Sequence, residues 1–177
     1  MVSRMLPLVA LIAVGAALSA CTATAPEPTE TALFSDEDEA FAAAEATYRA
    51  YVDALNAVDL SDPDTFEDVY AWTTGDLNAS DRKGLSAYHA DGVVVAGDSV
   101  ITILEPFDIS DSLDAVQLAA CVDISDVNVF DSEGDSLVDA DRPDFQQTTV
   151  TLEESTNSET GLLVASISPR TDGTKCG

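Results

Sequence analysis

The chain has 177 residues, of which 33 are Asp or Glu and seven are Lys or Arg, so its formal net charge at pH 7 is −26. A protein this acidic does not bind nucleic acid or an anionic lipid surface through its overall electrostatic field. The length is sufficient for one domain with a real hydrophobic core.

The first 20 residues have the layout of a secretory signal peptide. Arg4 precedes an apolar run from Met5 to about Leu18, and small residues follow. The run, roughly 14 residues long, is shorter than the ~20 residues that a membrane-spanning helix needs. The pattern therefore favours a cleaved signal peptide at 1–20 over a retained membrane span.

The four residues Leu18-Ser19-Ala20-Cys21 resemble the lipobox of bacterial lipoproteins. The resemblance implies that a diacylglycerol, with fatty acids such as palmitate, is linked to Cys21 and that cleavage makes Cys21 the new N-terminus. Two acyl chains anchor a protein stably on a membrane, whereas a single chain binds marginally. We therefore expect lipidation at Cys21 and a place on the extracytoplasmic face of the cell membrane. The alternative is a secreted protein whose Cys21 is unmodified.

The residues after Cys21 are rich in Thr, Pro, Ala and Glu and show no apolar periodicity up to residue 33. This composition predicts a disordered tether at 21–34, which joins the lipid to a domain expected at 35–177.

Three helices are expected at the start of that domain. Ser35 is the expected cap of a long first helix, because acids follow it and apolar residues then recur at three- and four-residue steps. Asp62 and Pro63 are typical of the start of a second, short helix, which should end by Gly75. The expected ranges of the first and third helices are 36–58 and 80–90.

From residue 93 onward the pattern changes to β-branched and alternating runs, which predict strands. Acidic and polar turns separate some of the runs, notably 131–135 and 156–160. Because no helical segment lies between the strands, the sheet should be antiparallel and the fold class α+β. The expected strands are 93–95, 99–109, 115–125, 126–130, 144–155 and 161–167.

This order of elements resembles that of the NTF2-like superfamily, in which a curved sheet wraps a long N-terminal helix into a cone. The segment Ala120-Cys121-Val122-Asp123-Ile124-Ser125, together with a C-terminal cysteine, is also similar to lipid-anchored actinobacterial NTF2-like proteins. The sequence departs from the family at 162–164, where Leu-Leu-Val stands in the last strand and many members have a tryptophan.

Cys121 and Cys176 are the two cysteines left once Cys21 is lipidated. Outside the cytoplasm such a pair tends to oxidise, so we expect a disulfide that ties the C-terminus to the sheet.

NTF2-like enzymes such as ketosteroid isomerase and the SnoaL-type cyclases place an acid, or an acid with a histidine, in the mouth of the cone. The resemblance makes Asp123 and His89 the candidate acid–base residues, with Tyr48 or Tyr51 as a hydroxyl donor. If Asp123 lined the cone, burial would raise its pKa. The alternatives are a solvated Asp123 at a strand end and a His89 that caps a helix or lies on the surface.

The sequence contains no clear motif for a metal site or a cofactor site. The acids of 131–141 offer ligands for calcium, but their glycine is misplaced for an EF-hand loop, so neither a metal nor a cofactor is expected. The preferred interpretation is a lipid-anchored, non-enzymatic cell-envelope module that binds another envelope protein or a small apolar ligand. The alternative is an extracytoplasmic isomerase or dehydratase, and a homodimer through the sheet is a further expectation.

Overall fold

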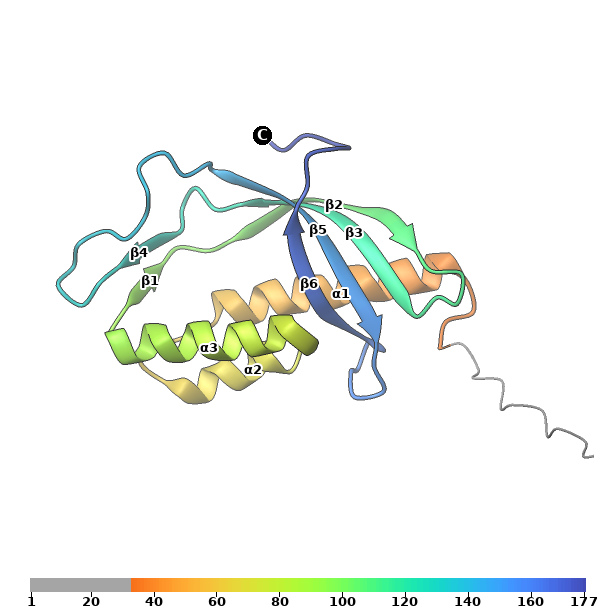
Figure 1. Cartoon of the computed structure of the whole chain (residues 1–177), viewed down its shortest axis with the longest axis horizontal. Coiled ribbons are helices and arrows are strands. Elements are labelled where there is room, and N and C mark those ends of the chain that lie inside the picture. The colour runs from red at the N-terminus through yellow and green to blue at the C-terminus, as the bar shows by residue number, and fades with distance from the viewer. Residues whose placement is uncertain (1–32) are drawn as a thin grey trace, which may run out of the picture. The chain divides into compact units, whose positions relative to one another are not determined.

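The computed structural model describes residues 33–177, in which three α-helices precede the strands (Figure 1). The helices lie on one side of a curved sheet, and the first of them runs beneath it. The elements are α1 (Glu37–Asn56), the 3-10 turn η1 (Pro63–Thr65), α2 (Phe66–Tyr70), α3 (Gly75–Asp91), β1 (Val94–Ala96), β2 (Val100–Ile109), β3 (Ala115–Asp123), β4 (Asn128–Phe130), β5 (Phe145–Glu154) and β6 (Leu162–Pro169).

Helix α1 begins with a capping arrangement displaced by one residue from the expected one. Asp36, rather than Ser35, is the N-cap, and its carboxylate accepts the backbone N–H of Glu39 at 2.9 Å. The Glu39 carboxylate in turn accepts the backbone N–H and the hydroxyl of Ser35, at 2.8 and 2.7 Å. These hydrogen bonds satisfy N–H groups that a helix start otherwise leaves free, and they lower the pKa of Glu39.

The apolar stripe of α1 faces the sheet, as the three- and four-residue spacing predicts. Phe34, which the sequence assigns to the tether, is also buried and belongs to the same hydrophobic core. From the sheet, alternate residues of each long strand point toward the helix, because side chains alternate between the two faces of a strand. The fully buried members of this core are Ala40, Ala44, Val69, Val116, Ala120, Val150, Leu152, Leu162 and Val164.

Helix α3 starts five residues earlier than expected, whereas the preceding helix ends before Gly75 as expected. Residue 75 is the first residue of α3, and α2 already ends at Tyr70. The Asn78 side chain holds the turn between them, because its amide donates to the carbonyl of Tyr70 at 3.0 Å and to the Thr73 hydroxyl at 2.9 Å. Thr73 itself forms a parallel bridge with Val164 of β6, which ties this turn to the edge of the sheet.

The main sheet is four-stranded and antiparallel, in the order β2-β3-β5-β6. In the register of β3 with β5, Leu118 lies opposite Val150 and Cys121 lies opposite Gln147. The antiparallel sheet is therefore as predicted, and 115–123 forms its central, most buried part.

Strands β1 and β4 form a separate two-stranded antiparallel sheet, which the sequence does not reveal. The chain leaves the main sheet after β3, pairs β4 with β1, and returns to it at β5. Gly97 lies between β1 and β2 with a φ of +83°, and a Cβ there would collide with the carbonyl oxygen of Asp126. The change of direction between the two sheets therefore needs a glycine at this position.

The C-terminal segment is fastened to the sheet, and the predicted Cys121–Cys176 disulfide is present, with Cα atoms 5.5 Å apart. Arg170 is 6% exposed, and its guanidinium donates to the carbonyls of Thr148, Asp172 and Thr174. Three donors of one buried cation thus satisfy carbonyls of the sheet and of the segment that follows β6, which fixes the path of residues 170–177.

Removing the cross-link should cost stability without changing the core. For Cys121→Ser with Cys176→Ser, we expect a loss of up to about 4 kcal/mol in the free energy of unfolding, because a loop of this length is no longer closed in the unfolded chain. Denaturant unfolding monitored by Trp72 fluorescence measures it. The matched control is the wild type under reducing conditions, which should lose the same amount; an unchanged midpoint in both would contradict the structural role of the bridge.

Candidate functional site

Asp123 does not lie on the inner face of the sheet, which packs against α1. The residues that face α1 are Val116, Leu118, Ala120, Val122 and Ile124, all in the hydrophobic core. Asp123 belongs to the opposite face, at the end of β3, where its carboxylate accepts the backbone N–H of Ser125 at 2.9 Å. Hydrogen bonds from Ser125 lower the pKa of Asp123, so the expectation of a raised pKa is wrong. Its place is that of a solvated carboxylate that stabilises a turn.

His89 lies on the surface near the end of α3. Its Nδ1 is 2.7 Å from the carbonyl oxygen of Leu60, and its ring meets that of Phe66 edge to face. Because a carbonyl only accepts hydrogen bonds, Nδ1 carries the hydrogen, and Nε2 is the basic nitrogen of the neutral ring. No carboxylate of residues 33–177 forms a salt bridge with His89, so the ring lacks the oriented acid that a general base needs.

Tyr48 and Tyr51 are buried between α1 and the sheet, with ring centroids 6.3 Å apart. Burial raises the pKa of Tyr48 to about 12; the Thr148 side chain lowers it slightly, although no hydrogen bond of good geometry joins the two hydroxyls. The Tyr51 hydroxyl is 3.4 Å from a carboxylate oxygen of Asp81 in α3, and burial raises the pKa of Tyr51 as well. Neither tyrosine is therefore ionised near neutral pH.

Asp81 is the carboxylate that the sequence does not single out. It is half-buried, and burial raises its pKa even though the hydrogen bond from Tyr51 acts in the opposite direction. Its position eleven residues before Gly92 on a weakly amphipathic helix gives no signal of this contact, because the contact depends on how α3 packs against α1. Asp81 and Tyr51 link the two helices; neither is joined by a hydrogen bond to Asp123 or His89 within the described part of the chain.

The space between α1 and the sheet is filled by the chain's own side chains. On the inner face of the sheet, Leu118, Val150, Leu152, Leu162 and Val164 are at most 1% exposed. Val116 on the same face is fully buried as well, and this packing leaves little room for a substrate between helix and sheet. The predicted acid–base residues Asp123 and His89 therefore do not line a common cavity between α1 and the sheet.

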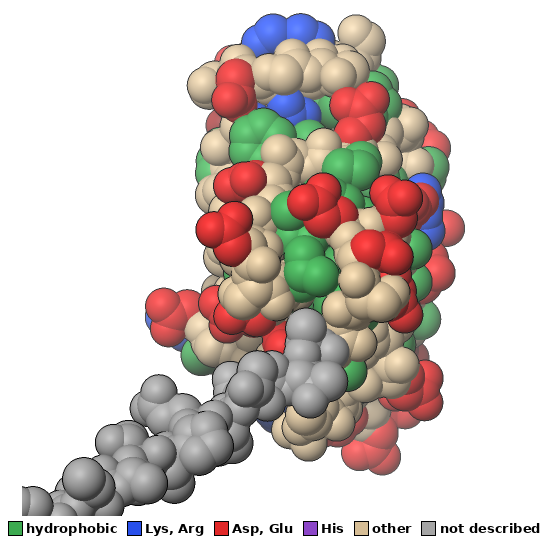
Figure 2. Space-filling model, turned by 90° about the vertical axis from the view of Figure 1, so that its right-hand side faces the viewer, with side chains coloured by type: hydrophobic (Ala, Val, Ile, Leu, Met, Phe, Trp, Pro, Cys, Tyr) green, Lys and Arg blue, Asp and Glu red, His purple; other side chains and the backbone are tan. Residues whose placement is uncertain are grey.

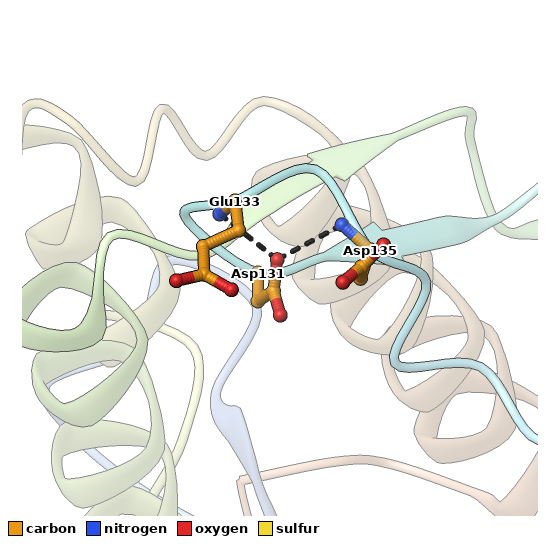
Figure 3. A group of neighbouring side chains, drawn as sticks. All are labelled: Asp131, Glu133 and Asp135. Carbon is orange, nitrogen blue, oxygen red and sulfur yellow. Dashed lines mark hydrogen bonds between the residues drawn. The ribbon is translucent and has the colours of Figure 1, made fainter.

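The acidic turn after β4 brings three carboxylates together. Side-chain oxygens of Asp131, Glu133 and Asp135 lie within 4.8 Å of one another. Figure 3 shows why: one oxygen of Asp131 accepts the backbone N–H groups of Glu133 and Asp135, both at 2.9 Å, so the three residues surround a single turn. These hydrogen bonds account for the arrangement, and the glutamate and Asp135 are exposed, so we assign no metal to it.

A groove of about 630 Å³ lies beside β1 and is the better candidate for a binding site. We call it the β1 groove. Its volume is within the range of natural ligand sites, which runs from roughly 300 to 1,000 Å³. It is lined by Val58, Asp59, Leu60, Ser61, His89, Gly92, Val93, Val94 and Val95.

The surface around the folded part is dominated by acidic side chains. In the face shown in Figure 2, they surround a narrow group of hydrophobic side chains, and the few cations lie mostly near the top of the view. Several cations of residues 33–177 are engaged within the fold: Arg142 donates to the carbonyls of Ile124 and Val127, and Arg82 lies over the ring of Tyr70. The surface field is therefore negative.

Among solved structures, the chain is similar to the intermembrane space region of the chloroplast protein ARC6, with a TM-score of 0.51 and 14% identity over 73% of this chain and 95% of that one. A provisionally named aromatic ring hydroxylase from Novosphingobium aromaticivorans has a TM-score of 0.49 and 12% identity over 76% and 96% of the two chains. CagV, a VirB8 homolog of the T4SS from Helicobacter pylori, has a TM-score of 0.47 and 11% identity over 72% of this chain and 95% of that one. No family model matches the chain, and no curated protein matches it significantly in sequence.

At these identities the likeness concerns the fold. The protein has an α+β fold in which N-terminal helices pack against a curved antiparallel sheet, as the order of its elements predicts, and its resemblance to the NTF2-like superfamily stays a prediction. Within residues 33–177, no helix is both long and apolar enough to cross a membrane.

The pKa of Asp81 leads to a prediction for stability against pH. Because burial in the folded protein raises this pKa above the ordinary value of an aspartate, ionisation of Asp81 favours unfolding, and stability is lost as pH rises through the folded pKa. Asp81→Asn should therefore be more stable than the wild type at pH 7, by less than about 1 kcal/mol for a half-exposed group. The difference should shrink toward pH 4. Thermal unfolding at both pH values measures it, and the exposed Asp53→Asn serves as control; equal effects of the two substitutions would contradict the assignment.

Proposed function

We propose that the protein is a lipid-anchored, extracytoplasmic binding module of the cell envelope, without catalytic activity. The observation that carries this proposal is the filled interior of the cone, from which both acid–base candidates are displaced. Asp123 is on the outer face of the sheet and His89 is bound to a backbone carbonyl on the surface. The protein would therefore bind its partner through its outer surface and not through its interior.

Three observations support the location. The apolar run after Arg4 and the sequence Leu18-Ser19-Ala20-Cys21 have the layout of a lipoprotein signal, although both lie outside the described residues. The Cys121–Cys176 disulfide is of a kind that persists in oxidising compartments and is rare in the cytosol. A similar fold forms the intermembrane space region of ARC6, which is likewise a region between membranes.

The charge of the protein fits a domain held close to a membrane but not bound to it. At −26, the chain is repelled by anionic lipid head groups, so the lipid on Cys21 and the tether would place the domain near the bilayer while its surface stays free for a protein partner. The same charge opposes a homodimer through the sheet. The outer face of the sheet moreover carries polar side chains, with Gln117 opposite Thr151 and Thr149 opposite Ala119, and so offers little apolar area to drive dimerisation.

The anchor is tested by substituting its attachment site. In Cys21→Ser, we expect the protein to move from the membrane fraction to the soluble fraction, because no thioether can form and the signal peptide alone is shorter than a membrane span. Thr22→Ser should leave the membrane fraction unchanged. Mass spectrometry of the N-terminal peptide should find a diacylglyceryl group on the wild type; an unmodified Cys21 in the wild type would refute the anchor.

The filled interior predicts that the protein retains no small apolar ligand. Native mass spectrometry of the Cys21→Ser protein should give the mass of the polypeptide alone, as a monomer, since the buried side chains between α1 and the sheet leave little room for a bound molecule. A Leu118→Ala variant, which opens a cavity in the same place, should lose about 2–5 kcal/mol of stability and serves as the positive control for uptake of an apolar probe. A bound molecule in the parent protein would instead favour the ligand-binding or enzymatic alternative.

A further inference from the structure

We propose that the free edge of β1 binds an extended, basic segment of a partner protein, which adds to the small β1–β4 sheet as a further strand. This inference rests on the proposed function as a binding module and specifies its surface and the chemistry of its partner. It is carried by the hydrogen-bonding pattern of β1, the groove beside it, its exposed valines and the charge of its surroundings.

The backbone of Val95 points away from β4. Val95 lies opposite Val129 in the antiparallel register, and the Val129 carbonyl accepts the N–H of Leu137 on the far side of β4 at 2.8 Å. Because the N–H and C=O of a strand residue point to the same side, Val129 does not bond to β1, and Val95 is the non-hydrogen-bonded partner in that pair. The N–H and C=O of Val95 therefore face the open edge, and neither has another partner among the hydrogen bonds of the described residues.

The open edge of β1 borders the β1 groove. The segment Val58–Ser61, which follows α1, also lines the groove, together with His89 and Gly92. The side chain of Asn56, the last residue of α1, exchanges two hydrogen bonds of 2.9 Å with the backbone of Ser99, just beyond β1. These hydrogen bonds join the segment that follows β1 to the end of α1, and so hold in place two of the segments that line the groove.

Apolar side chains are exposed on both faces of β1. Val94 is 55% exposed and Val95 is 43% exposed, and successive residues of a strand point to opposite faces. Tyr88, at the end of α3, and Leu137, beside β4, are exposed to similar extents, so four of the large exposed hydrophobic residues lie around this small sheet. An unpaired edge with exposed valines is a template for strand addition.

The charge of this region selects the occupant. Asp59 lines the groove, and hydrogen bonds from Ser61 hold the pKa of its carboxyl below the usual value, so it is ionised at neutral pH. Asp91 and Asp98 flank β1 in the sequence, and neither a lysine nor an arginine lines the groove. A second copy of this chain would bring the same acids to the edge, whereas a strand with Lys or Arg would be attracted to it.

The partner segment is therefore an extended peptide in which apolar and basic residues alternate. Backbone hydrogen bonds to Val95 would supply register, apolar side chains would cover the exposed valines, and cations would lie near Asp59. Strand addition of this kind takes its affinity from the main chain and its specificity from alternate side chains.

A direct test uses the full-length protein in detergent, with a synthetic peptide of about six residues, the usual length of a strand, that alternates lysine and valine. We expect binding by titration calorimetry and slowed hydrogen exchange at the Val95 amide. The same peptide N-methylated on its valines cannot donate hydrogen bonds to the edge, and its methyl groups hinder close approach of the two backbones. Its affinity should therefore fall at least about tenfold, which corresponds to the loss of about one hydrogen bond and the added steric hindrance. A peptide with glutamate in place of lysine should not bind.

Two variants of the protein complete the test. Val95→Pro removes the outward N–H without removing a bond to β4, a substitution that edge strands accept, and it should weaken binding at least about tenfold. Val95→Thr keeps the backbone donor and the branched shape, and its affinity should change less than about twofold. If the proline variant fails to fold, the methylated peptide gives the same answer.

Three outcomes overturn the inference: no binding, equal binding of the methylated peptide, or protection of the Val95 amide by self-association without peptide. Equal binding would mean attraction by charge alone, and self-association would make a second copy the occupant. Peptide binding does not depend on the lipid, and the mass of the same sample shows whether Cys21 is lipidated. A result against strand addition at β1 can therefore be distinguished from a result against the lipid anchor.

Discussion

The packing of α1 against the inner face of the sheet is the interaction on which the remainder of the structure depends. One side of a single helix and alternate residues of β3, β5 and β6 supply most of the hydrophobic core, and α2 adds Phe66, Val69 and Tyr70. Burial of this apolar area provides the dominant favourable term in folding. The same packing fills the interior: because Leu118 and Leu152 occupy the space between α1 and the sheet, most polar side chains lie at the edges and on the outer faces of the protein.

The parts of the fold that could be predicted from the sequence are those set by local periodicity. The stripe of α1 and the alternation of β3 each follow from a repeat within one element, and the cysteine pair follows from the redox compartment. The start of α3 was misplaced because Asn78 and the Thr73–Val164 bridge, both tertiary contacts, decide where the helix begins. The β1–β4 pair was missed for a related reason: three residues carry too little pattern to reveal a partner more than thirty residues away.

The candidate site shows the same limit. Alternation placed Asp123 correctly on the face of Cys121 but could not tell which face the helix covers, and the resemblance to enzymes with an acid in the cone favoured the wrong one. Asp81 could not have been found, because its contact with Tyr51 joins two helices whose relative placement no sequence spacing encodes. The groove beside β1 depends on the same kind of long-range arrangement. What the sequence conveys about function is therefore an expected location and a net charge, and not the residues of a reaction.

The separation of 55 residues between Cys121 and Cys176 has a consequence for how the molecule matures. A polypeptide is made from its amino end, so the sulfur of Cys121 in β3 exists before β5, β6 and its own partner have been synthesised. Until the residues that follow β6 reach the side of the sheet away from α1, this thiol has to remain reduced. Its oxidation is therefore a late event, which records that both later strands have joined the sheet.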